Sequence, residues 1–158
     1  MINRRFFQEA ANVAKGATCT HAKCGAVIVS KDGEVIGRGF NAPPLNDESQ
    51  RMCDTPFDLG LKPKYDKTCC VHAEWNAIID ALKNSSTKIE GSVLYFMRID
   101  EGGGFTDAGD PFCTVCSRLA LQSGIGEFAL WDDGPQIYDT KSYNSKSYDY
   151  HKLYIKNN

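Results

Sequence analysis

Apolar side chains in the first forty residues follow a helical period and then a strand pattern. Residues 3–15 carry apolar positions three or four apart, which predicts an amphipathic helix that ends near Gly16. Residues 25–30 and 35–40 are β-type runs, and they flank a polar turn with the sequence Lys31-Asp32-Gly33-Glu34. The chain is therefore expected to begin with one helix followed by two antiparallel strands.

The middle of the chain alternates between the same two patterns. Residues 72–82 and 113–122 have helical spacing, and Gly124 is expected to stop the second helix. Residues 92–97 and 126–131 are expected to be strands. The resulting order, α-β-β-α-β-α-β, predicts an α/β sandwich with a mixed sheet.

Three segments have no clear period. Residues 41–70 form a long stretch rich in proline, in which Cys53, Cys69 and Cys70 suggest a pinned loop. Residues 102–110 are a glycine-rich loop. Residues 132–158 are rich in Asp, Ser, Tyr, Lys and Asn, and we interpret them as a C-terminal arm, a lid or plain surface of a single domain over 1–158.

Composition narrows the class of protein. The 158 residues are 42% hydrophobic and 24% charged, as expected for one globular domain, and no apolar run reaches the length of a membrane span. The N-terminal residues develop no signal-peptide core, so a cytoplasmic location is expected. A net charge of −2 argues against a nonspecific nucleic-acid binder. Seven cysteines, an odd number, favour metal or catalytic use over a disulfide framework.

The chemistry concentrates at the starts of the two middle helices. Cys113 and Cys116 stand three apart, which puts both sulfurs on one face of a helix start, where the thiolate is favoured. His72 could supply a third ligand, and a catalytic zinc takes three protein ligands and keeps a fourth position open. Glu74, two residues after His72, can serve the same site only if that site lies off the helix end. The sequence therefore predicts two parallel neighbouring helices whose starts face one metal.

These motifs, His-x-Glu followed by Cys-x-x-Cys, resemble those of the zinc-dependent cytidine and deoxycytidylate deaminases. The resemblance begins at Cys24-Gly-Ala-Val-Ile-Val-Ser-Lys-Asp-Gly and continues through Cys70-Val-His-Ala-Glu-Trp-Asn-Ala-Ile to Cys113-Thr-Val-Cys. The Gly39-Phe-Asn-Ala-Pro stretch and the Asn76-Ala-Ile segment are most similar to the deoxycytidylate branch.

The resemblance implies a three-layer sandwich, a homo-oligomer and hydrolytic deamination of a cytosine nucleotide similar to dCMP. It implies that His72, Cys113 and Cys116 hold zinc and that Glu74 shuttles protons. Asn41 would contact the sugar or base, and the backbone of Ala73 would meet the carbonyl edge of the pyrimidine.

Two aromatic residues are further candidates for substrate contact. Phe112 separates Pro111 from Cys113, where the family form has proline directly before cysteine, and it is expected to stack on a base or wall the site. Trp131 ends a strand near the edge of the sheet where ligands bind in α/β proteins. Four cations near the motifs are candidates for a phosphate contact: Lys23, Arg38, Arg98 and Arg118.

Some relatives carry a second, structural zinc, and six residues here could supply four ligands: Cys19, His21, Cys24, Cys53, Cys69 and Cys70. Their spacing matches no standard zinc module, so this site stays an open expectation.

Three other functions stay open. The altered loop before Cys113 keeps open deamination of another small aminated ring, such as a nucleoside, a purine base or a modified pyrimidine. An editing deaminase on RNA or single-stranded DNA is disfavoured by the charge. A non-catalytic zinc domain used for assembly would gain nothing from Glu74 beside three ligands.

Overall fold

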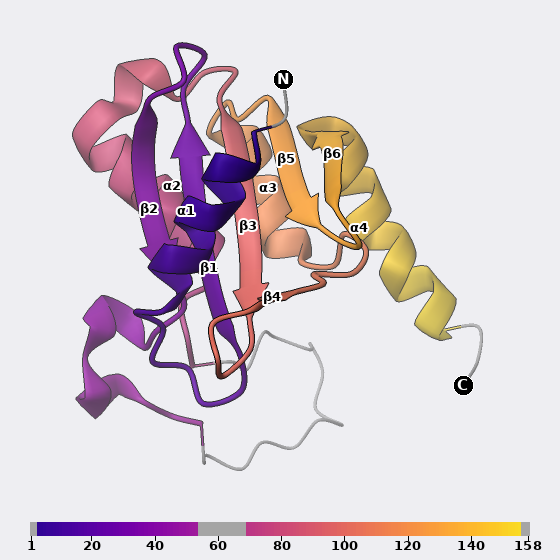
Figure 1. Cartoon of the computed structure of the whole chain (residues 1–158). Coiled ribbons are helices and arrows are strands. Elements are labelled where there is room, and N and C mark those ends of the chain that lie inside the picture. The colour runs from indigo at the N-terminus through magenta and orange to yellow at the C-terminus, as the bar shows by residue number, and fades with distance from the viewer. Residues whose placement is uncertain (1–2, 54–68, 156–158) are drawn as a thin grey trace.

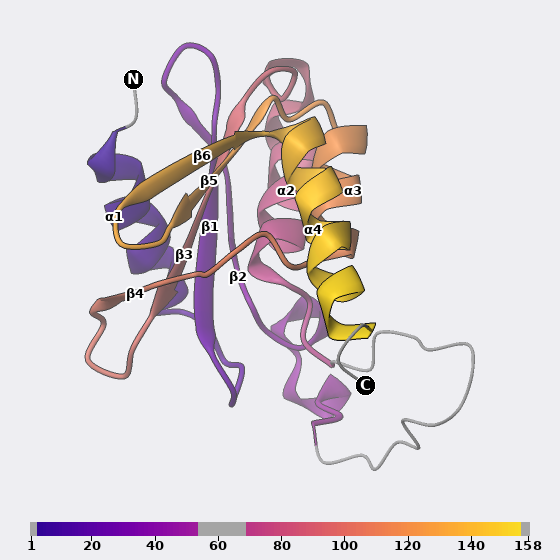
Figure 2. The same ribbon diagram turned by 90° about the vertical axis from the view of Figure 1, so that its right-hand side faces the viewer.

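A central sheet with helices on both faces makes up the fold (Figures 1 and 2). The computed structural model describes residues 3–53 and 69–155, with side chains up to Tyr150. The sheet order is β2-β1-β3-β5-β6, with β4 paired to β3. The strands are β1 (Lys23–Val29), β2 (Val35–Phe40), β3 (Val93–Ile99), β4 (Phe105–Thr106), β5 (Glu127–Trp131) and β6 (Pro135–Asp139). The expected mixed sheet is confirmed: β3 and β5 are parallel, and the other pairs are antiparallel.

The helices divide unequally between the two faces, as the side view in Figure 2 shows. One face carries α1, and the other carries α2, α3 and α4, which gives the expected three layers. Their bounds are α1 (Arg4–Ala14), α2 (Ala73–Ser85), α3 (Thr114–Gln122) and α4 (Thr140–Ile155). Short 3-10 turns span Pro44–Asn46, Glu48–Gln50 and Ser86–Lys88. No helix within the described ranges is long and apolar enough to cross a membrane.

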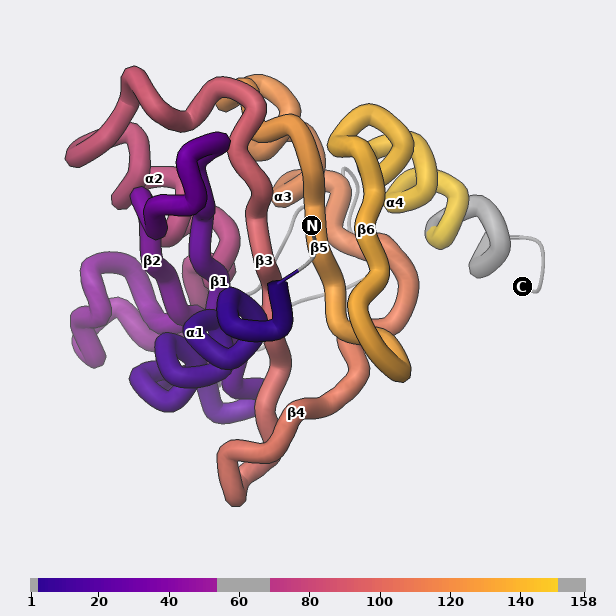
Figure 3. The backbone as a smooth tube through the Cα atoms, turned by 45° about the horizontal axis from the view of Figure 1, so that its top comes forward, coloured from indigo at the N-terminus to yellow at the C-terminus, as the bar shows by residue number. Residues whose placement is uncertain are grey.

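The amphipathic pattern of the first helix explains its place on the sheet. Asn3 caps α1 by accepting a hydrogen bond from the Arg5 backbone N–H at 2.9 Å. Phe6 and Phe7 are buried and contact Tyr95 of β3, with ring centroids 5.3 and 5.0 Å apart. Figure 3 shows α1 lying across β1 and β3, so one face of the sheet is closed by this helix.

Glycines in β2 let α2 lie directly on the sheet. A Cβ at Gly39 would come within 2.3 Å of the Ala77 nitrogen and 2.4 Å of the Ala73 oxygen. A Cβ at Gly37 would meet the Ala77 oxygen at 2.4 Å. These atoms belong to the α2 backbone, which cannot move aside alone, so β2 fixes the position of α2 and of the residues at its start.

The C-terminal segment corrects the sequence interpretation. The described part of residues 132–158 is neither an arm nor a lid, because it forms β6 and α4 as parts of the sandwich. Tyr143 is buried and stacks on Phe128 with ring centroids 3.9 Å apart. The polar composition did not indicate this role, because polar side chains of α4 pack against α3: Ser117 of α3 donates to Asn144 at 2.8 Å, and its oxygen lies 3.1 Å from that of the buried Ser147.

The two loop segments without a clear sequence period, 41–70 and 102–110, contain some regular structure. The described part of the stretch over 41–70 contains two 3-10 turns, and residues 54–68 lie outside the described residues. The glycine-rich loop over 102–110 contains the short strand β4, which pairs with the end of β3. Both loops leave the sheet at the edge to which the carboxyl ends of β2 and β3 point.

Replacing Gly39 with alanine should destabilise the protein by at least about 2 kcal/mol, because the added methyl group overlaps the α2 backbone. Urea unfolding followed by circular dichroism measures the change. Gly102→Ala is the matched control, since its nearest new neighbour would be an Asp100 oxygen at 3.4 Å, and it should stay within about 0.5 kcal/mol of the parent protein. Equal midpoints for both variants would contradict the close approach.

Ser117→Ala should destabilise the protein by about 1–3 kcal/mol, because it removes the hydrogen-bond contacts of Ser117 with Asn144 and with the buried Ser147 of α4. Ser145→Ala, at an exposed position of α4, should change the free energy of unfolding by no more than about 0.5 kcal/mol. The same urea titration compares them, and a neutral Ser117 variant would mean that α4 does not depend on this contact.

Candidate metal centre and active site

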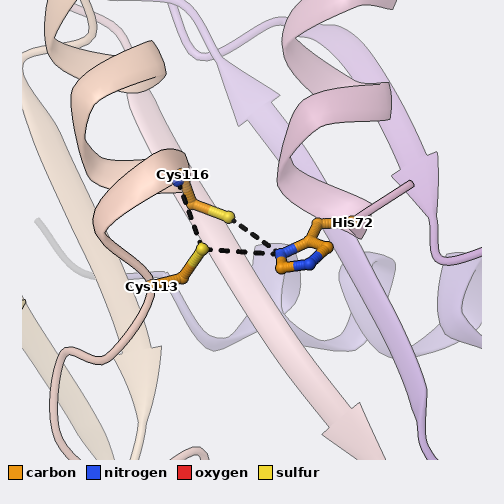
Figure 4. Close-up of side chains that lie close together, drawn as sticks. All are labelled: His72, Cys113 and Cys116. Atoms are coloured by element: carbon orange, nitrogen blue, oxygen red, sulfur yellow. Dashed lines mark hydrogen bonds between the residues drawn. The ribbon is translucent and has the colours of Figure 1, made fainter. Parts of the chain in front are cut away.

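Three side chains far apart in the sequence meet at one edge of the sheet (Figure 4). The Nδ1 atom of His72 lies 3.2 Å from the Cys116 sulfur and 3.5 Å from the Cys113 sulfur. All three ligand atoms lie within 4.8 Å of one another. Within the described ranges, this is the one group of three or more metal-ligating side chains that is so compact.

The starts of α2 and α3 both lie at this three-ligand group, as the sequence predicted. His72 is the N-cap of α2, and Cys113 is the N-cap of α3. The Cys113 sulfur accepts a hydrogen bond from the Cys116 backbone N–H at 3.3 Å, and a helix N-terminus stabilises negative charge. The pKa of Cys113 is lowered to about 4, first by a hydrogen bond with the Cys116 side chain, although burial opposes the shift.

The donor set fits zinc. One imidazole nitrogen and two sulfurs are ligands that zinc prefers, and three protein ligands leave a fourth tetrahedral position for water or substrate. Burial raises the pKa of Cys116, so a bound cation would displace a proton from this thiol. His72, Cys113 and Cys116 are therefore the residues that would hold the ion.

Trp75 supports the ligand ring. Its indole stacks on the imidazole of His72, with ring centroids 4.5 Å apart and an angle of 9° between the planes. Its position one residue after Glu74, in the first turn of α2, lets it fix the plane of the histidine that faces the two sulfurs.

Glu74 is a buried carboxyl group next to these ligands. It lies in the first turn of α2, and Glu74 is only 7% exposed to solvent. Its pKa is raised, chiefly because burial disfavours the charged form, and the nearby Cys113 sulfur adds to the shift. A carboxyl group whose pKa is raised takes up a proton more readily than a free one, which suits it to proton transfer.

The metal centre opens into a cavity of about 660 Å³, a size typical of small-molecule sites. Its sheet-side lining comes from Cys24 of β1, Phe96 and Arg98 of β3, and Leu130 of β5. The loop before α3 and the helix α4 contribute further lining residues, among them Asp110, Tyr143 and Tyr150.

The expected substrate contacts Ala73 and Phe112 line this cavity. Ala73 is the first residue of α2, where backbone N–H groups have no partner within the helix. Phe112 is 53% exposed and packs edge-on against Tyr150, with centroids 4.8 Å apart.

Asn41 also lines the cavity, but its side chain is already engaged. Its oxygen accepts from the Cys24 backbone N–H at 2.9 Å, and its amide donates to the Ala22 carbonyl at 2.9 Å. Asn41 therefore ties the start of β1 to the end of β2, a role that the sequence did not suggest.

Trp131 lies on the other face of the sheet, so the structure does not support it as a lining residue. It packs edge-on against Phe7 and Phe105, with centroids 5.4 and 5.1 Å apart, and the Arg4 guanidinium lies 5.4 Å from its ring centroid. Side chains alternate along a strand, so Leu130 faces the cavity and Trp131 faces α1.

The six candidates for a second zinc divide into two groups. The Cys53 and Cys69 sulfurs lie 3.1 Å apart, the Cys69 and Cys70 sulfurs lie 3.9 Å apart, and the Cys19 side chain interacts with that of Cys70. These four follow one another in a row and do not form a compact set within the described residues. His21 and Cys24 line the main cavity, and a second zinc stays a prediction.

Asp110 and Tyr143 were not singled out from the sequence, although both line the cavity. Asp110 comes three residues before Cys113, and that proximity is a signal that could have placed it at the site. Tyr143 could have been found only by recognising a helix in the polar C-terminal segment.

Cys113→Ser should remove one equivalent of tightly bound zinc per chain, because two protein ligands hold the ion much more weakly than three. Cys24→Ser is the matched control, since this cysteine lines the cavity outside the ligand group and should leave the zinc content unchanged. Elemental analysis of the purified proteins measures both. Equal zinc content in the two variants would contradict the ligand assignment.

The chain is similar to curated deoxycytidylate deaminases. It is 27% identical to the deoxycytidylate deaminase of Pongo abelii over 114 residues, which is 72% of this chain and 54% of that protein. The human deoxycytidylate deaminase is also 27% identical, over 118 residues and the same shares. The chain thus spans about half the length of the curated relatives it matches.

Solved structures support the fold. A cytidine deaminase from Burkholderia pseudomallei has a TM-score of 0.59 and 17% identity, with 90% of this chain and 96% of that chain covered. The dCMP deaminase from the cyanophage S-TIM5 in complex with dCMP and dUMP has a TM-score of 0.56 and 23% identity, with 79% and 76% covered.

The family model of the cytidine and deoxycytidylate deaminase zinc-binding region matches residues 1–131. Because this match takes in both His72 and the Cys113–Cys116 pair, the chain belongs to the cytidine and deoxycytidylate deaminase family.

Proposed function

We propose that this chain is a zinc-dependent hydrolytic deaminase that converts a cytosine nucleotide similar to dCMP into the corresponding uracil nucleotide and ammonia. The observation that carries the proposal is the buried Glu74 carboxyl group beside the three-ligand group in one cavity. A purely structural zinc site is usually closed by a fourth ligand and has no use for such a carboxyl group.

Bound zinc would supply a water molecule that is acidic enough to act as a nucleophile at neutral pH. Glu74 would take a proton from the attacking water and pass it to the ring nitrogen while the water oxygen bonds to the carbon that carries the amine. Glu74 then delivers the second water proton to the amine, the carbon–nitrogen bond breaks, and ammonia leaves. One carboxyl group serves all these transfers because it gains and loses a proton in turn.

The lining residues fit a flat, polar ring. The first N–H groups of α2, at Ala73, are donors for a ring carbonyl, and Phe112 offers an aromatic face or edge. Asn41 uses one amide hydrogen on Ala22 and keeps a second for a sugar hydroxyl. The relatives named deoxycytidylate deaminase, and the cyanophage dCMP deaminase in complex with dCMP and dUMP, favour a deoxycytidine nucleotide.

A second candidate is deamination of another small aminated ring without a phosphate. The observation in its favour is Asp110, a carboxylate from the loop before α3 that lines the cavity and would repel a nearby phosphate.

A homo-oligomer and a cytoplasmic location also belong to the proposal, and both rest on the family resemblance. Light scattering tests the oligomeric state.

Ammonia release from a panel of compounds tests the function. The zinc-loaded protein is assayed with dCMP, CMP, deoxycytidine, cytidine, cytosine, guanine and adenosine. Turnover of dCMP supports the proposal, whereas turnover of a ring without phosphate alone favours the second candidate. No turnover of any compound, with zinc bound, would overturn both.

Glu74→Gln should keep the zinc content and the fold but lower kcat on the order of 10²- to 10⁴-fold, because the amide cannot transfer protons. Glu101→Gln is the control, since its side chain is 96% exposed and it should leave kcat unchanged. Steady-state kinetics and elemental analysis compare the two. Near-parental turnover in the Glu74 variant would rule out its role.

A further inference from the structure

Arg98 is the one arginine or lysine among the described residues that line the cavity. It lies near the end of β3, two residues after Phe96, so the two side chains point to the same face of the sheet. Its Cα is paired with that of Cys24 on β1, another lining residue. The register of the sheet therefore holds this guanidinium over the same cavity as Glu74.

The other cations near the motifs are engaged elsewhere. Arg38 forms an ion pair with Glu9 at 2.9 Å, and Lys23 lies 3.9 Å from Glu101. Arg118 donates to the Thr114 carbonyl at 3.1 Å and borders a separate depression beside α3. None of these three residues lines the cavity.

Arg98 has no carboxylate partner among the ion pairs of the described residues. Its contact within the protein is with the neutral Cys24 thiol, whose pKa is raised to about 11, first because of burial. A guanidinium offers a planar fork of N–H donors that matches a phosphate, and it binds most strongly where no other anion competes for it.

The cavity has a buried end near Glu74 and an exposed end near Arg98. Glu74 and Cys116 are buried, whereas Arg98 is exposed. A substrate whose ring reaches Glu74 therefore has its opposite end toward solvent, on the side where Arg98 lies. The second carboxylate of the lining, Asp110, belongs to the loop before α3 and forms no ion pair with Arg98.

We propose that Arg98 binds the phosphate of the substrate and thereby makes this cavity select a nucleoside monophosphate over the free nucleoside. The inference rests on the proposed deaminase function and adds to it the residue that recognises the phosphate. Arg98 acts on binding, not on proton transfer, so its removal should affect phosphorylated substrates and spare unphosphorylated ones.

The experiment compares Arg98→Gln and Arg98→Lys with the parent protein, all zinc-loaded. Steady-state kinetics with dCMP and deoxycytidine give kcat/KM for each, and calorimetric titration with dUMP and deoxyuridine measures binding without turnover. Arg98→Gln should lower kcat/KM for dCMP on the order of 10²-fold, mainly through KM, and weaken dUMP binding similarly. Values for deoxycytidine and deoxyuridine should change less than about threefold, and Arg98→Lys should recover part of the loss because it keeps the charge.

Arg38→Gln is the matched control, since it removes an arginine of β2 that lies outside the cavity, and it should leave all four values unchanged. An equal loss for phosphorylated and unphosphorylated ligands in Arg98→Gln would mean a structural role and would overturn the proposal. Unchanged dCMP kinetics and dUMP binding would overturn it while the deaminase function stands. Phosphate-dependent binding that needs Arg98, without turnover of any ligand by the parent protein, would uphold the phosphate site and reject the deaminase function.

Discussion

The site depends on one spatial constraint, which is that α2 and α3 begin at the same edge of the sheet. Two antiparallel steps relate β2 to β3 and a parallel pairing relates β3 to β5, so all three strands run in one direction. The helix that follows β2 and the helix that follows β3 therefore both start at the carboxyl edge of the sheet. Helix starts carry positive partial charge, so two sulfurs and a carboxyl group are tolerated there together.

Close packing of α2 on β2 helps to fix the positions of the ligand atoms that this topology brings together. The backbone of α2 lies so near β2 that glycine is required at Gly37 and Gly39, and this contact leaves the helix little freedom to slide. His72 is held at its start by that contact and by the stacked ring of Trp75. A metal site needs its ligand atoms fixed to within a few tenths of an ångström, and here the backbone contact supplies most of that rigidity.

The sequence predicted the site better than its surroundings. His72 and Glu74, two residues apart, can serve one site only if that site lies off a helix end. This spacing therefore predicted that two helix starts face one metal. By contrast, Trp131 was misplaced because the sheet face of a strand residue depends on register, which a five-residue strand does not reveal. The C-terminal helix was missed because serine and asparagine are typical of surface positions. Here Ser147 is buried, and both Ser147 and Asn144 contact the Ser117 hydroxyl of α3.

Electrostatics fits both proposed roles in one cavity, a proton carrier and an anion site. Burial raises the pKa of Glu74. At the exposed end, the Arg98 guanidinium has no carboxylate partner among the ion pairs of the described residues. A nucleotide has the matching polarity, with a neutral ring at one end and a charged phosphate at the other. Reversing the nucleotide would place the phosphate beside buried Glu74 and two sulfurs and would leave the guanidinium without a partner. For the proposed nucleotide substrate, the charge pattern therefore favours one orientation, which would bring the ring and not the phosphate to the metal centre.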